Sequence, residues 1–216
     1  MNMIFLGPPG IGKGTHGEIV SRKYGIPRVS TGEIMREEVK KGTDLGNDIK
    51  SYMDSGELVP DELVINIIKK RVNQKDCKRG FILDGFPRTV RQAKELGEIT
   101  KIELVVNFVA SEDEIIERIT GRLTCRKCGA IYHVKNIPPK KEGVCDNCGG
   151  ELYHREDQEE RAVERRMEVY EKSTKPLIEY YRKESMLKDV NVEGGKEEVS
   201  KRIDKVIEDF IRSKGA

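Results

Sequence analysis

The stretch GPPGIGKGT, residues 7–15, constrains the fold of this chain more than any other part of its sequence. It follows the apolar run MIFL and precedes a helical stretch that begins near Lys13, so it joins a strand to a helix. Its spacing matches G-x-x-x-x-G-K, and the hydroxyl of Thr15 comes two residues after the lysine. In such a loop, glycine lets backbone N–H groups face a polyphosphate, and the helix N-terminus favours negative charge. The loop therefore predicts a nucleotide phosphate site in which Lys13 reaches the outer phosphates and Thr15 helps to hold Mg²⁺.

Strand and helix patterns alternate along the rest of the chain. Short runs fit strands at 3–6, 28–30, 81–84, 102–109 and 190–192. Helical stretches are expected from about 13 onward and at 32–40, 44–55, 61–73, 89–97, 112–120, 159–183 and 196–213. Ser111 and Glu114 have the spacing of a capping box at the start of one helix. Buried strands that alternate with helices indicate an α/β fold, with a P-loop NTPase-type parallel β-sheet of about five strands flanked by helices.

Charge and hydropathy exclude several other classes of protein. Lys and Arg number 40 and Asp and Glu 38, so the net charge is only +2, which argues against a general polyanion binder. The N-terminus lacks the basic and apolar regions of a signal peptide, and no window approaches 18 apolar residues. We therefore expect a cytoplasmic protein without a membrane partner.

Four of the five cysteines form a regular pattern. Cys125, Cys128, Cys145 and Cys148 have the spacing C-x2-C-x16-C-x2-C, which is typical of a four-thiolate zinc site. Such a site has no open coordination position, so its Zn²⁺ would be structural. A disulfide is less expected in a cytosolic chain, where thiols are kept reduced, and iron can also occupy four thiolates. Cys77 stands apart and is expected to be a reduced, half-buried thiol.

The apolar run FILD places Asp84 at the end of a strand. A carboxylate beside a phosphate loop suits a water-mediated contact to Mg²⁺. Asp84 could instead simply begin a turn before Gly85, but its combination with the phosphate loop favours the magnesium contact.

Four motifs follow one another in a recognisable order: GPPGIGKGT at 7–15, STGEIMR at 30–36, Asp-Gly-Phe-Pro-Arg at 84–88 continuing to Gln92, and Tyr-His at 132–133. In these motifs the chain closely resembles adenylate kinases of the long form with a zinc-bearing lid, over essentially its whole length. The resemblance implies a core of residues 1–29, 60–120 and 159–216, a small helical AMP-binding domain at 30–59 and a zinc-ribbon-like lid at 121–158. It also implies the reaction MgATP + AMP ⇌ 2 ADP, by direct in-line transfer without a phosphoenzyme.

The resemblance also assigns residues to each nucleotide. For ATP it implicates Gly10, Ile11, Gly12, Lys13, Gly14, Thr15, Arg118, Arg122, Ile131, Tyr132 and Lys196. For AMP it implicates Thr31, Arg36, Glu57, Leu58, Val59, Gly85, Phe86, Pro87, Arg88, Gln92, Arg155 and Arg166. The residues expected to act in the transfer are Lys13, Arg88, Arg122, Arg155, Asp157 and Arg166. Arginine suits this chemistry because its planar fork binds phosphate bidentately and stays charged.

The chain departs from the family pattern at a few positions. In the segment HREDQEE the family usually shows Arg-x-Asp-Asp, whereas this chain has Gln158 in the place of the second aspartate. If that carboxylate pairs with lid arginines in a closed state, closure is weaker here or Glu156 substitutes for it. His16 replaces a usual Gln, and Gly17 replaces a common Ala at a helix-propensity cost of about 1 kcal/mol.

Two other functions remain open on the sequence alone. Another nucleoside monophosphate kinase, or a relative that uses GTP, would share these motifs; Gln92 favours adenine at the monophosphate site by resemblance, but the triphosphate site encodes its base poorly. A nucleotide switch with a zinc ribbon for a partner or for nucleic acid is more distant, although residues 122–155 carry seven Lys or Arg against three Asp or Glu. A switch has no use for a second-substrate set such as Arg36, Arg88 and Gln92. We therefore expect a monomer that binds ATP, AMP and ADP and no nucleic acid.

Overall fold

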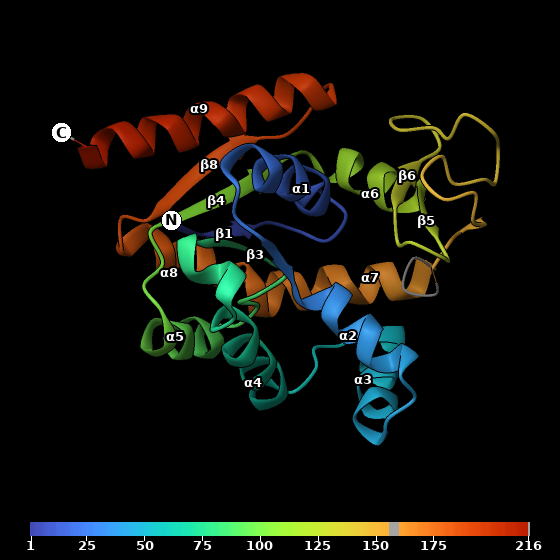
Figure 1. The fold of residues 1–216 in the computed structure, drawn as a ribbon, viewed down its shortest axis with the longest axis horizontal. Coiled ribbons are helices and arrows are strands. Elements are labelled where there is room, and N and C mark those ends of the chain that lie inside the picture. The colour runs from blue at the N-terminus through green and yellow to red at the C-terminus, as the bar shows by residue number, and fades with distance from the viewer. Residues whose placement is uncertain (156–159, 216) are drawn as a thin grey trace.

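The computed structural model describes residues 1–155 and 160–215, and it confirms the predicted α/β architecture (Figure 1). A five-stranded sheet with the order β2-β3-β1-β4-β8 runs through the body. All four neighbouring strand pairs in it are parallel. The strands of this sheet are β1 (Asn2–Leu6), β2 (Arg28–Ser30), β3 (Phe81–Asp84), β4 (Leu104–Val109) and β8 (Leu187–Asn191).

Strand β1 shows why helices must cover both faces of the sheet. Ile4 and Leu6 pack into one hydrophobic core, and Met3 and Phe5 pack into the other. Because side chains alternate across a strand and both faces are buried, the strand is a continuous apolar run. The first core is covered by α4 (Asp61–Val72), α5 (Val90–Ile99) and α8 (Pro176–Lys183). The second is covered by α1 (Lys13–Tyr24), α6 (Glu112–Thr120) and α9 (Lys196–Gly215).

Two helices that follow β2 project from the body as a hairpin (Figure 1). These are α2 (Thr31–Lys40) and α3 (Asp44–Ser55), close to the predicted ranges. Each begins at a hydroxyl that accepts a hydrogen bond from the first turn: Ser30 from the Glu33 N–H and Thr43 from the Gly46 N–H. These caps satisfy backbone donors that a helix leaves unpaired at its N-terminus.

The long helical stretch predicted at 159–183 is interrupted by one wider turn. Its described part consists of α7 (Glu160–Val169), a π-helical turn at Tyr170–Thr174 and α8. The hydroxyl of Thr174 donates to the backbone carbonyl of Arg88 at 3.0 Å. The wider turn thus attaches this helical segment to the loop that follows β3, and π-turns are frequent at functional sites.

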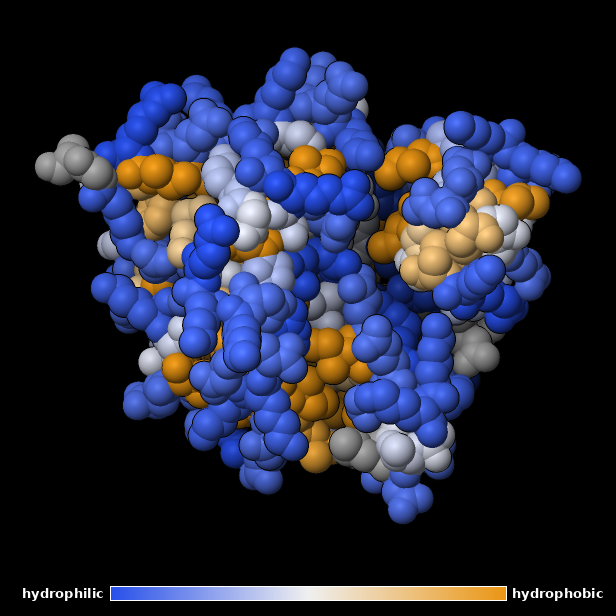
Figure 2. All heavy atoms as spheres, in the orientation of Figure 1, coloured by the Kyte–Doolittle hydropathy of each residue, from blue (hydrophilic) through white to orange (hydrophobic). Residues whose placement is uncertain are grey.

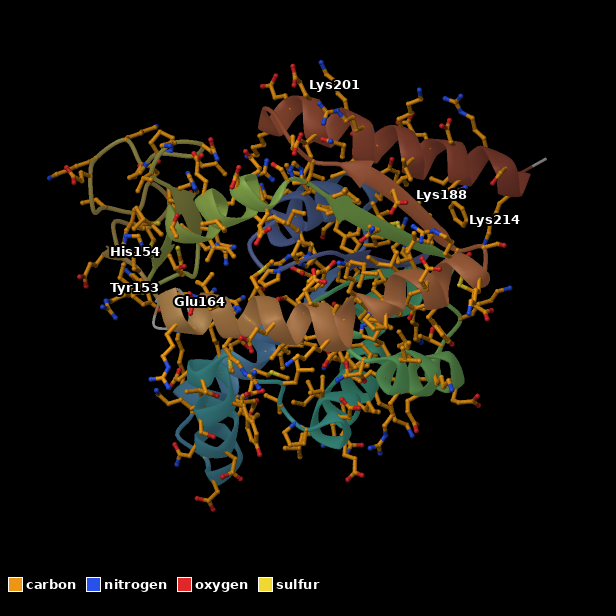
Figure 3. All side chains as sticks on the ribbon, turned by 180° about the vertical axis from the view of Figure 1, so that it is seen from behind. Tyr153, His154, Glu164, Lys188, Lys201 and Lys214 are labelled. Carbon is orange, nitrogen blue, oxygen red and sulfur yellow. The ribbon has the colours of Figure 1, made fainter. Side chains whose placement is uncertain are left out.

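The segment that breaks the strand–helix alternation, called the insertion here (residues 121–158), carries its own small sheet. Its strands are β5 (Arg122–Cys125), β6 (Ile131–His133) and β7 (Leu152–Tyr153), which are antiparallel in the order β6-β5-β7. Figure 3 places Tyr153 and His154 where the insertion meets the end of α7 that carries Glu164. The insertion therefore returns to the body at the beginning of this helix.

Two local expectations were wrong. The last strand is β8 at Leu187–Asn191 rather than 190–192, because it pairs along the edge of β4 with its charged side chains exposed. The Ser111 side chain makes no capping hydrogen bond to α6. Instead, the Ser111 backbone N–H donates to Glu193 at 2.8 Å, and Glu114 accepts a hydrogen bond from Arg118 at 2.7 Å. Both partners of the expected capping box are thus engaged elsewhere.

The surface is mainly hydrophilic. In Figure 2, apolar side chains form small, separate patches, and a hydrophilic groove lies between the insertion and the body. Within residues 1–155 and 160–215, no helix has the length and apolar character needed to cross a membrane.

Candidate active site

Residues 7–15 form a tight loop around the N-terminus of α1. Gly10 has a φ of +79°, and a Cβ there would lie 2.1 Å from Cγ1 of Ile119, so the loop requires glycine at this position. The ammonium group of Lys13 donates to the carbonyl oxygens of Gly7 at 2.8 Å and Pro8 at 2.6 Å. The predicted lysine thus lies within the loop, directly in front of the helix.

Burial lowers the pKa of Lys13 to about 7. The carboxylate of Asp84 opposes this shift, and three guanidinium groups add to it: Arg88, Arg166 and Arg122. A cation held among other cations is costly to the fold, because removal from water and like charge both disfavour the protonated form.

This cost predicts a stability that depends on pH. The pKa of Lys13 is about 7 in the folded protein and about 10.4 in an unfolded chain, so between these values the unfolded state binds more protons and stability rises with pH. We expect Lys13→Met to be more stable than the parent protein by about 1–3 kcal/mol at pH 7, with the difference shrinking as the pH approaches 10. Urea unfolding of both proteins at pH 7 and pH 9.5 measures it; an equal difference at both values would contradict the assignment.

A cleft of about 300 Å³ opens over the loop. Among the described residues, its lining contains two lysines and seven arginines, against the two carboxylates of Glu33 and Asp84. The arginines are Arg28, Arg36, Arg88, Arg118, Arg122, Arg155 and Arg166. The chain as a whole is nearly neutral, so this concentration of positive charge is local and suits a polyanion such as a nucleoside triphosphate.

A smaller pocket adjoins the cleft and shares four of its arginines: Arg36, Arg88, Arg155 and Arg166. Apolar side chains such as Met35, Val59 and Val64 also line it, together with the amide of Gln92. This combination suits a flat base at one end and a phosphate at the other. The shared arginines therefore lie where two bound phosphates could meet.

Asp84 lies beside the phosphate loop, since a Cβ built on Gly14 would be 3.4 Å from its Oδ2 atom. The Arg28 guanidinium donates to Asp84 at 3.0 Å and also pairs with Glu33. The aliphatic part of the Arg28 side chain passes α1 at Gly17, where a Cβ would lie 2.6 Å from Cδ of Arg28. The departure from Ala at Gly17 thus makes room for Arg28. Arg28 was not a predicted site residue, and the unusual glycine is the signal in the sequence that points to it.

The residues predicted for ATP all line the larger cleft. Besides Lys13, Arg118 and Tyr132 also bind other groups of the protein. Arg118 donates to the carbonyl oxygens of Ile11 at 2.9 Å and Val192 at 2.7 Å, so it holds the phosphate loop to the end of β8. The buried hydroxyl of Tyr132 accepts a hydrogen bond from the Asp146 N–H at 2.8 Å, so its ring belongs to the interior of the insertion.

The residues predicted for AMP line one or both pockets, with the exception of Phe86. The Phe86 ring is 1% exposed and packs into a core of the body. Glu57 accepts a hydrogen bond from Arg165 of α7 at 2.6 Å, which attaches the loop after α3 to that helix. Asp157, together with Glu156 and Gln158, lies outside the described residues.

His16 also lines the cleft, where its imidazole lies 3.2 Å from the Ser200 hydroxyl. Burial lowers the pKa of His16 to about 4, and the nearby charges of Arg118 and Lys196 add to the shift. The ring is therefore neutral near pH 7, as is the glutamine that the family usually has there. The substitution at this position is visible in the sequence, but no role was predicted for the residue.

The four paired cysteines come together at the insertion, with their sulfur atoms all within 4.8 Å of one another. The Sγ atoms of Cys125 and Cys148 are 3.5 Å apart, and those of Cys128 and Cys145 are 3.6 Å apart. A tetrahedral zinc ion with bonds of about 2.3 Å holds its sulfurs about 3.8 Å apart, whereas a disulfide requires about 2 Å. The arrangement fits a four-thiolate metal site. Cys77 is 4% exposed, more deeply buried than expected.

Comparisons with known proteins decide the family. The family model described as adenylate kinase matches residues 5–186. The chain belongs to the adenylate kinase family. The adenylate kinase of Archaeoglobus fulgidus is 55% identical over 213 residues, which cover 96% of this chain and 98% of the relative. That of Geotalea daltonii is 48% identical over 213 residues, with 96% and 100% covered, and that of Methanocella arvoryzae is 49% identical over 205 residues, with 93% and 95% covered.

The match to the adenylate kinase family confirms the resemblance seen in the four sequence motifs. The matched range includes the phosphate loop, the arginines shared by the two pockets and the four paired cysteines. Of the residues predicted to contact nucleotides, only Lys196 lies beyond it. The insertion thus lies within the range that the family model matches.

Proposed function

We propose that this adenylate kinase family member transfers the terminal phosphoryl group of MgATP directly to AMP and so forms two molecules of ADP. The observation that carries the proposal is the set of arginines shared by two adjoining pockets: Arg36, Arg88, Arg155 and Arg166. A hydrolase or a nucleotide switch needs one nucleotide pocket. Two pockets that share cationic side chains suit two phosphorylated substrates.

The larger cleft binds the triphosphate. Backbone N–H groups of Gly10 to Thr15 surround the phosphates, and the Lys13 ammonium turns from the loop carbonyls to the outer phosphates. The hydroxyl of Thr15 and the carboxylate of Asp84, the latter through water, hold Mg²⁺, which neutralises phosphate charge when bound. The rest of the nucleotide lies against Lys196, Arg118 and Ile131. The position of Asp84 beside Gly14 supports this arrangement.

The smaller pocket binds the monophosphate, with its base against Gln92 and its phosphate against Arg36 and Arg88. An oxygen of that phosphate attacks the terminal phosphorus of ATP, so no side chain acts as a nucleophile. Charge spreads over the transferring oxygens in the transition state, where the arginine guanidinium groups stabilise it. The main contributions of the protein are thus positioning and electrostatic stabilisation. Both pockets are formed by one chain, which supports action as a monomer.

The insertion acts as a lid stapled by one Zn²⁺ ion, held by Cys125, Cys128, Cys145 and Cys148. A small hydrophobic cluster of Cys125, Tyr132, Cys145 and Leu152 supports this role, because it is too small to fold the segment without a metal. The lid at 121–158 closes over ATP and excludes water, the domain at 30–59 closes over AMP, and the remaining residues form the core.

Product analysis tests the proposal. The purified protein is mixed with MgATP and AMP, and all three adenine nucleotides are quantified by chromatography beside a control that lacks AMP. We expect two ADP for each ATP consumed, and only when AMP is present. One ADP per ATP, independent of AMP, would indicate an ATPase instead. Substituting other monophosphates and GTP for the two substrates then determines the base preference of each pocket.

A further inference from the structure

The side-chain amide of Gln92 is held at both ends by other groups of the protein. Its Oε1 atom accepts a hydrogen bond from the backbone N–H of Arg88 at 2.7 Å. Its Nε2 atom donates to Oδ1 of Asp61 at 2.7 Å. The side chain is 1% exposed, and it lines the smaller pocket. Gln92 is therefore a fixed part of the pocket wall.

These two partners allow only one orientation of the amide. A backbone N–H can only donate, and a carboxylate can only accept, so a flipped amide would place donor against donor and acceptor against acceptor. With a neutral partner in place of Asp61, only the Arg88 N–H would still oppose the flipped amide, so the preference for one orientation would be weaker. Asp61 and the Arg88 N–H therefore determine together which atom of Gln92 lies on which side.

Asp61 is itself fixed at the first residue of α4. Its second oxygen accepts a hydrogen bond from the Thr89 hydroxyl at 3.1 Å. That hydroxyl in turn accepts from the Gln92 backbone N–H at 3.1 Å, as the N-cap of α5. Asp61 lines neither pocket, so it influences a bound base through Gln92 rather than by direct contact.

We propose that Asp61 is a positioning residue for the base of the monophosphate, and that it acts by reinforcing the one orientation of the Gln92 amide that the Arg88 N–H also favours. This inference rests on the proposed function. An amide has two N–H donors and two acceptor sites, so within the described part of the chain Gln92 keeps one of each for a ligand. An adjacent acceptor and donor, such as N1 and the 6-amino group of adenine, match them. Hypoxanthine and guanine present the reverse pattern, with a donor at N1 and an acceptor at O6.

The test compares AMP with inosine monophosphate as phosphoryl acceptors for the full-length protein and its Asp61→Asn variant. An asparagine side chain can either donate or accept, so the variant removes one of the two constraints on the amide and leaves only the Arg88 N–H to oppose the flip. We expect the ratio of kcat/KM for AMP to that for inosine monophosphate to fall about tenfold, through a higher KM for AMP and a lower KM for inosine monophosphate. Asp61→Ser is the alternative variant if the asparagine variant is unstable. It also removes the obligatory acceptor, and serine suits the first turn of a helix.

Glu62→Gln is the matched control, because it makes the same change of charge one residue away on a side chain that pairs with Arg91. We expect it to keep the parental ratio. In a Gln92→Ala background, Asp61→Asn should leave the ratio unchanged, since residue 61 then has no side-chain amide to orient. An equal loss toward both monophosphates in Asp61→Asn, or an unchanged ratio, would overturn the inference. Failure of the parent protein to phosphorylate AMP would overturn the proposed function instead.

Discussion

Lys13→Met is expected to lower kcat about 10³-fold while leaving the protein folded. The lysine donates to two carbonyls of the phosphate loop, and in the proposed reaction it stabilises charge that develops on the transferring oxygens. Methionine keeps the length of the side chain and removes only the charge. Initial rates of ADP formation at saturating MgATP and AMP measure the effect, and a thermal melt establishes that the variant is folded.

Lys94→Met is the control for this variant, because Lys94 is exposed on α5, outside both pockets. It should keep the parental kcat. A Lys13→Met protein with more than a tenth of the parental kcat would refute the role of Lys13 in transfer. Since the same substitution is expected to stabilise the protein at pH 7, a loss of rate cannot be attributed to unfolding.

Removal of the metal from the insertion is expected to unfold that segment and lower activity about 10²-fold or more. Cys145→Ser replaces one thiolate, and a hydroxyl is a poor ligand for zinc. The hydrophobic cluster around Tyr132 has few members and cannot hold the segment without the metal. The body has two cores of its own and should remain folded. Metal content by elemental analysis and hydrogen exchange of residues 121–155 measure the two effects.

Cys77→Ser provides the matched control, because Cys77 lies in the body and accepts a hydrogen bond from Arg71 at 2.9 Å. It should retain one metal ion per chain and normal exchange in the insertion. Elemental analysis of the parent protein also identifies the metal as zinc or iron. A Cys145→Ser protein that keeps slow exchange throughout the insertion would contradict a metal-dependent fold.

The central sheet could be predicted from the sequence because its signals are local. The run MIFL followed by a glycine-rich turn and a helix is recognisable without knowledge of distant partners, and the same holds for FILD before Gly85. The Ser111 cap failed because Glu193, 82 residues away, binds the backbone group that the capping box would use. The strand β8 was misplaced because its exposed charged residues do not resemble a buried strand.

The candidate site likewise has parts that could be predicted from the sequence and parts that could not. The phosphate loop and the four cysteines have fixed spacings that were readable in the sequence. Contacts between side chains from different motifs were not readable, because they depend on how the chain folds. Arg28 reaches Asp84 across 56 positions, and Asp61 reaches Gln92 across 31. Neither Arg28 nor Asp61 was a predicted site residue.

The contact between Gly17 and Arg28 has a consequence for the order in which substitutions can accumulate. The Arg28 guanidinium is held by Asp84 and Glu33, so its aliphatic part has little freedom to move aside for a methyl group on α1. Alanine at position 17 is expected to be tolerated better once Arg28 has been replaced, and Arg28 better when position 17 is glycine. The two positions are therefore expected to be epistatic, so that the cost of Gly17→Ala depends on whether Arg28 is present.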